Sequence, residues 1–169
     1  MKPCGLRRAQ AQLVSSEREA FGPFVPLVAS AYLWAILGGA LLLVDGLAQL
    51  VGLVAPINPD AARHSLALGF IALLICGVAP RMVPGFSGGR IASPVLVTAS
   101  LWLGNGAALL RVVALLAAPA LAALGSAGTT ADHVAFGLSG PAGLALAVCL
   151  AVNLWPALWP RQTARQMAE

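Results

Sequence analysis

Two histidines, His64 and His133, each stand where a long apolar run of the sequence begins. A neutral imidazole is the commonest metal ligand among side chains. If the two apolar runs are parallel helices, the two rings lie at similar depth and could ligate one metal or haem iron between them. The alternative is that each ring occupies the polar interface at the end of a membrane helix. The sequence leaves both interpretations open.

Asp45 and Arg111 form a second matched pair of chemically distinctive residues. Each lies 18 residues past the start of an apolar run, counted from Leu27 and Ser93 respectively. At 1.5 Å per helical residue, both charges rise roughly 27 Å from the same end. An unpaired charge at the centre of a span costs about 2.5–3.5 kcal/mol, and such residues usually face the bundle interior. We expect a structural ion pair between Asp45 and Arg111, or an anionic group such as a haem propionate or a substrate bound at Arg111.

The composition predicts what kind of protein positions these residues. Of the 169 residues, 59% are hydrophobic and 9% are charged, whereas a soluble domain carries roughly 25% charged residues. The composition therefore indicates an integral membrane protein with the lipid bilayer as its solvent. The net charge of +4 needs no nucleic-acid partner, because the placement of the charges explains it.

Four apolar runs have the length of a transmembrane helix, which takes roughly 20 residues. They cover about Leu27–Val54, His64–Ala79, Ser93–Ala118 and His133–Leu154. The runs are continuous rather than alternating, which favours helices over a β-barrel. The sequence thus predicts an all-α, four-helix membrane bundle. The second run is short, so we expect its helix to extend back through residues 60–63 with Asp60 as its cap, and Asp132 to cap the fourth helix in the same way.

Basic residues predict the orientation of this bundle. With four spans, one side receives Lys2, Arg7, Arg8, Arg18, Arg81, Arg90, Arg161 and Arg165, and the opposite side receives Arg63. The positive-inside rule then places both termini in the cytoplasm. We expect a cytoplasmic segment over residues 1–24, a transmembrane domain over 25–160 and a cytoplasmic tail over 161–169, in the cell inner membrane. Arg81 has an ordinary role here, as a topology anchor.

The remaining polar and aromatic residues indicate packing more than chemistry. Asn105 and Asn153 lie within the third and fourth predicted helices, where they could hydrogen-bond across the bundle. The four tryptophans are expected mainly toward the cytoplasmic interface; they are Trp34, Trp102, Trp155 and Trp159. The sequence contains no Gly-rich phosphate loop and no Ser/His/Asp set, which disfavours a hydrolase, and whether the chain is an enzyme stays open.

Several of these motifs together resemble the NnrS family of haem- and copper-containing membrane proteins linked to nitric oxide. In that family a His opens a helix, a Gly follows five residues later and an Arg closes it, as do His64, Gly69 and Arg81 here. "NGAALLRVVA" is similar to the family's Ala-Ala-Leu-Leu-Arg helix, with Arg111 on its arginine, and "NLWPALWPR" is similar to its last helix. The resemblance covers about residues 63–161, the family's last four helices.

The resemblance implies haem or copper binding and a part in the response to nitric oxide. His64 and His133 would be the metal ligands, with Arg111 beside the cofactor's anionic edge. After the arginine that closes this helix, at the position of Arg81, the family has a Gly-His-Thr-Gly-Arg turn. This chain has Phe86 at the position of the histidine, so a metal role of that turn is lost. The second hypothesis is a cofactor-free accessory or structural subunit of a larger membrane complex. Its partner would be another membrane protein or a second copy of the chain.

Overall fold

The computed structural model describes residue 22, residues 24–54 and residues 57–159 of the chain. The helices are α2 (Phe24–Leu50), α3 (Pro59–His64), the π-helical segment η1 (Ser65–Ala72), α4 (Leu73–Ser87), α5 (Pro94–Ala123) and α6 (Ser126–Leu158). The described residues contain no strand, in agreement with the all-α prediction. Residues 1–21 and 160–169 lie outside the described residues, and with them nearly all of the predicted cytoplasmic segment 1–24 and the whole predicted tail 161–169.

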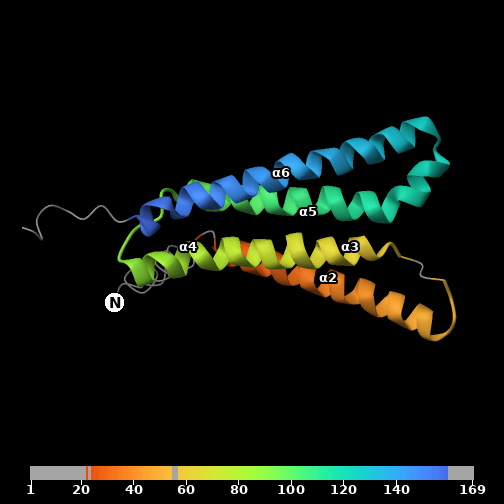
Figure 1. The fold of residues 1–169 in the computed structure, drawn as a ribbon, viewed down its shortest axis with the longest axis horizontal. Coiled ribbons are helices and arrows are strands. Elements are labelled where there is room, and N and C mark those ends of the chain that lie inside the picture. Colours follow the sequence, from red (N-terminus) through yellow and green to blue (C-terminus); the bar gives the residue numbers. More distant parts are fainter. Residues whose placement is uncertain (1–21, 23, 55–56, 160–169) are drawn as a thin grey trace, which may run out of the picture.

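Four rods in the described part of the chain are long and apolar enough to cross a membrane. The helices α3, η1 and α4 join end to end into one of these rods, Pro59–Ser87, and the predicted backward extension of the second helix is confirmed. Figure 1 shows two antiparallel hairpins, one of α2 with the α3–η1–α4 rod and one of α5 with α6. The start of α2 and the end of α6 lie at the same end of the bundle. That end is the predicted cytoplasmic end, and its orientation in a membrane stays a prediction.

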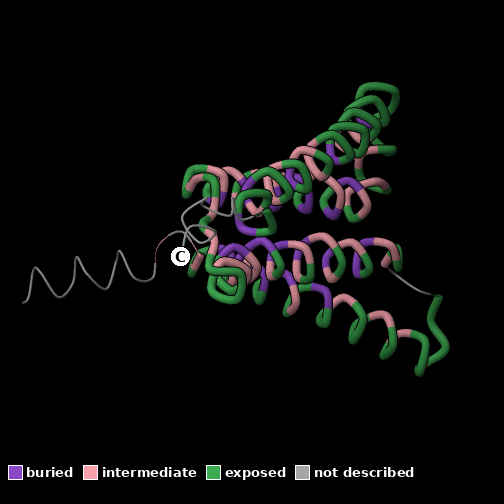
Figure 2. Tube along the Cα trace, turned by 60° about the vertical axis from the view of Figure 1, so that its left-hand side comes forward, coloured by how far each residue is buried: buried purple, intermediate pink, exposed green. Residues whose placement is uncertain are grey.

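The first of these helices, α2, buries a narrow stripe of residues. Leu27, Ala31, Trp34 and Gly38 are its buried positions, and their spacing of four, three and four residues keeps them on one face of a helix. The stripe ends halfway along α2, and no residue from 39 to 50 is buried. Figure 2 shows the same pattern, with the buried residues of the tube gathered where the helices pack together. Residues 39–50, called the outer half of α2 below, therefore contribute little to the core.

The second rod begins with a cap that differs from the prediction. Asn58, not Asp60, is the N-cap of α3, and its side-chain oxygen accepts a hydrogen bond of 3.0 Å from the backbone N–H of Asp60. Pro59 explains the difference, because a proline keeps the preceding residue extended and itself suits the first helical position. Asp60 consequently lies in the first turn of α3.

The start of α6 is also corrected. The helix begins at Ser126 rather than near His133, because Gly125 alone makes the turn after α5 with a φ of +75°, a conformation that glycine adopts without steric cost. Gly128 then packs directly on the carbonyl of Leu121, where a side chain would collide. His133 is thus the eighth residue of α6, and Asp132 lies within the helix and does not cap it.

Small residues allow the rods to pack closely. A side chain at Gly69 in η1 would collide with the indole of Trp34, and one at Gly104 in α5 would collide with Leu73. Close approach of this kind through small residues is typical of membrane helices, where dispersion contacts rather than the hydrophobic effect hold helices together. The two glycines therefore set the distance between α2, the second rod and α5.

Candidate functional site

His64 is held at the last position of α3 by its own helix. Its Nδ1 lies 2.8 Å from the main-chain oxygen of Asp60. A carbonyl oxygen only accepts, so Nδ1 carries the proton of the neutral ring and Nε2 keeps its lone pair. The carboxylate of Asp60 instead forms an exposed ion pair of 3.0 Å with Arg63. The His64 ring is therefore oriented by the main-chain oxygen of Asp60 and not by its carboxylate.

His133 does not share this environment. It is exposed on α6, whereas His64 is half-buried on α3. The helix α3 packs against α2 and α5, while α6 packs against α5 and α4, so α5 is the helix that contacts both histidine-bearing helices (Figure 1). Among the described residues, no group of three or more His, Cys, Asp or Glu side chains could hold a metal ion. A haem or metal ion held between the two histidines alone stays a prediction.

Asp45 lies in the outer half of α2, on the continuation of its buried stripe. The Gln49 amide donates a hydrogen bond of 2.7 Å to Oδ2 of Asp45, one helical turn away. The other carboxylate oxygen, Oδ1, is buried and has no hydrogen-bond partner within the described residues. Unsatisfied buried polar atoms are rare in native proteins, and each one calls for an explanation. Asp132 carries a second such oxygen.

Arg111 has an aromatic partner. Its guanidinium carbon lies 3.7 Å from the centre of the Phe136 ring, a cation–π contact between α5 and α6. Across the described residues the ion pair is Arg63–Asp60, and the structure does not bring Asp45 and Arg111 into contact. Their pairing stays a prediction, and so does an anionic ligand at Arg111.

A buried polar network joins three helices near the middle of the bundle. The indole N–H of Trp34 donates to Oδ1 of Asn105 at 2.9 Å, and the Asn105 amide donates to Ser30 at 3.2 Å. The hydroxyl of Ser65 donates to the main-chain oxygen of Trp34 at 2.9 Å. Trp34 is only 7% exposed, so its predicted place in an interfacial belt is wrong. The sequence signal for this network was Asn105 within an apolar run.

A second asparagine closes the end of the bundle at which α2 begins. Oδ1 of Asn153 in α6 accepts from the backbone N–H of Ser93 at 2.9 Å, and its main-chain oxygen accepts from Ala92 at 3.0 Å. Ser93 is itself the N-cap of α5. This asparagine therefore fixes the start of α5 against the end of α6, as expected for a residue that hydrogen-bonds across the bundle.

The fold and these contacts define a four-span helical membrane protein, counted over the described residues. Its central polar groups satisfy one another, and its outer half carries two buried carboxylate oxygens without a partner in the described residues, one on Asp45 and one on Asp132. The chain has no match among protein-family profiles, curated proteins or solved structures. Its function therefore has to be argued from the geometry.

Proposed function

We propose that the chain is an accessory subunit of a membrane assembly, and that it binds another transmembrane segment along the outer half of α2. The observation that carries this proposal is the buried, unpartnered Oδ1 of Asp45. An ionisable side chain inside a membrane span is stable when it is paired or hydrogen-bonded. Gln49 satisfies one oxygen, and a donor from a second segment would satisfy the other.

The packing of α2 supports the same conclusion. All of its buried residues lie between Leu27 and Gly38, so the outer half of the helix has room beside it for a neighbouring helix. Asp45 continues the inward-facing stripe and is half-buried. A partner helix that covers this stripe would extend the core of the bundle and exclude lipid from the carboxylate. Polar contacts of this type between membrane helices contribute about 0.6 kcal/mol on average, with a maximum of about 1.7.

Photo-cross-linking in native membranes tests the proposal. A photoreactive side chain is placed at Leu42, which lies roughly 60° around the helix from Asp45 at 100° per residue. The matched control is Leu43, roughly 160° away on the opposite face. Both positions are exposed in the isolated chain, at 50% and 63%. We expect a protein adduct from Leu42 and none, or far less, from Leu43.

The identity of the adduct separates the two kinds of partner. An adduct of twice the chain's mass indicates a second copy, and any other mass indicates a different membrane protein. Equal adducts from both positions, or none from either, would contradict the proposal, because lipid alone would then surround the outer half of α2.

A second candidate function follows from His64. The NnrS-like hypothesis of haem or copper binding and a role in nitric oxide response is favoured by the hydrogen bond from Nδ1 to the Asp60 carbonyl. Ligating histidines typically have their second nitrogen fixed in this way. In this hypothesis His64 would be the better-ordered ligand, and the exposed His133 would be the weaker, exchangeable one.

A visible absorption spectrum and the metal content of the detergent-purified protein test this candidate. The parent protein should contain haem or copper, His64→Ala should lose it, and His133→Ala should keep it. A parent protein without haem or copper, or full occupancy in both variants, would rule the candidate out. Neither outcome affects the cross-linking test.

A further inference from the structure

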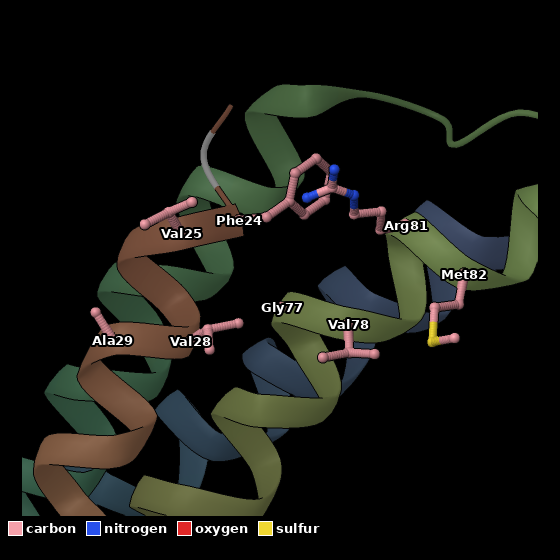
Figure 3. A pocket seen from close by; sticks show the side chains of 8 residues that line it. All are labelled: Phe24, Val25, Val28, Ala29, Gly77, Val78, Arg81 and Met82. Atoms are coloured by element: carbon pink, nitrogen blue, oxygen red, sulfur yellow. The ribbon is translucent and has the colours of Figure 1, made fainter. Parts of the chain in front are cut away.

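An apolar groove of about 500 Å³ runs between α2 and α4 at the end of the bundle where α2 begins (Figure 3). Side chains such as Val28 and Ala29 from α2 and Val78 from α4 line it. At its floor is Gly77, where an added Cβ would stand 3.0 Å from a methyl group of Val28. The missing side chain therefore brings the floor close to α2 and leaves the space above it open.

One charged residue, Arg81, stands among the residues that line the groove. Figure 3 shows its side chain at the mouth of the groove, which Phe24 also lines. The carboxylates of the described residues belong to the outer half of α2, to the first turn of α3 and to the second turn of α6, toward the opposite end of the bundle (Figure 1). The described part of the chain gives Arg81 no ion pair. The groove thus combines an apolar floor with a positive charge at its mouth.

We propose that this groove binds one anionic phospholipid, with an acyl chain between α2 and α4 and the phosphate at Arg81. The volume falls in the range of ligand sites, roughly 300–1,000 Å³. A guanidinium presents paired N–H donors that match a phosphate. Basic pockets between helices on the cytoplasmic side are suited to anionic headgroups, because that leaflet carries negative charge.

The location of the groove at one end of the bundle supports this assignment. Among the described residues, Arg81 and Arg90 both lie at this end, and the positive-inside rule applied to the sequence predicts it to be cytoplasmic. A topology anchor that merely reaches to the interface would act like any other arginine there and would not depend on the groove. Arg90, exposed at the same end, is the matched comparison for charge alone.

Native mass spectrometry of the full chain tests the site. The purified protein is mixed with phosphatidylglycerol and phosphatidylcholine of identical acyl chains, and the retained lipids are counted. The parent should prefer phosphatidylglycerol, and Arg81→Gln should lower that preference about fivefold, the effect of one basic residue near the surface. Arg90→Gln should leave the preference unchanged. Ala29→Phe, which fills the groove from an exposed position, should abolish retention, whereas Ala40→Phe, exposed on the same helix away from the groove, should not.

Four results would overturn the proposal. One is a parent protein that shows no preference between the two lipids. The second is an equal loss in Arg81→Gln and Arg90→Gln, which would assign the preference to diffuse charge. The third is lipid retention that appears only in the double variant Glu17→Gln/Glu19→Gln. Arg81 would then be ion-paired with one of these carboxylates in the parent protein and not free to bind a phosphate. Retention in both phenylalanine variants would likewise place the lipid elsewhere.

Discussion

The indole N–H of Trp34 donates a 2.9 Å hydrogen bond to Oδ1 of Asn105, which links α2 to α5 between residues 71 positions apart. The Asn105 amide in turn donates to the Leu101 carbonyl at 2.8 Å and to the Ser30 hydroxyl. Each polar group in this part of the bundle has a partner within the chain. The network therefore links the two hairpins, and its polar groups satisfy one another.

A double-mutant cycle measures this link. Trp34→Phe removes the N–H and keeps most of the ring, and Asn105→Ala removes the acceptor. We expect the two losses in unfolding free energy to be non-additive by about 0.5–1.5 kcal/mol, the range for hydrogen bonds between membrane helices. Unfolding in mixed micelles provides the measurement. Strictly additive losses would mean that the two side chains do not interact in the folded protein.

Alanine substitutions of two nearby glycines in α5 should change the stability of the bundle in different directions. Gly104→Ala places a methyl group against Leu73, whereas at Gly106 an added Cβ meets nothing within 4 Å. We expect Gly104→Ala to destabilise the bundle by about 1–3 kcal/mol through overpacking. Gly106→Ala should be neutral or stabilising by up to about 1 kcal/mol, because alanine favours the helix. Thermal unfolding in detergent checks both, and equal effects would show that α5 is rotated from its position here.

Arg111 and Asp45 have different partners in the structure, and mutant cycles distinguish these contacts from the ion pair that the sequence predicts. Arg111 lies over the ring of Phe136, so Arg111→Met and Phe136→Leu should show a coupling of about 0.5–2 kcal/mol. Arg111→Met and Asp45→Asn should be additive within about 0.5 kcal/mol. Additive losses for Arg111 and Phe136 together with coupled losses for Arg111 and Asp45 would support the ion pair that the sequence suggested.

Much of the architecture could be predicted from apolar run length alone. Four spans follow from it, because a bilayer dictates the length of a helix. Helix ends could not be predicted as well. Pro80 and Pro84 look like breakers in sequence, yet α4 continues through both to Ser87, as prolines are tolerated in membrane helices. Likewise, Gly125 alone suffices for the turn before α6, which moves His133 away from the helix start.

The candidate site was harder to predict, because it depends on how each helix is rotated about its axis. Matching depth suggested that His64 could meet His133 and that Asp45 could meet Arg111. Depth does not fix which way a side chain faces, and the structure leaves His64 half-buried and His133 exposed. Trp34 was expected at an interface because tryptophan favours one, but its N–H is more stable on Asn105 inside the bundle.

Orientation in the membrane can be checked by cysteine labelling. In a background without Cys4, Cys76 and Cys149, we expect Val54→Cys to react with an impermeant maleimide from outside intact cells. Ser87→Cys should react only after the membrane is opened. Both positions are exposed. Labelling of the two positions from the same side would contradict the four-span topology, and exchanged labelling would invert it.

The most direct test of the proposed function is the effect of Asp45 on the adduct formed from Leu42. Asp45→Leu removes every hydrogen bond of the carboxylate, and Asp45→Asn keeps part of that capacity without the charge. Asp60→Asn is the control, since Asp60 is exposed and paired with Arg63. We predict a loss of adduct of about threefold to twentyfold in Asp45→Leu, a smaller loss in Asp45→Asn and none in Asp60→Asn. An unchanged adduct yield in both Asp45 variants would contradict the account, because the unpartnered oxygen would then play no part in association.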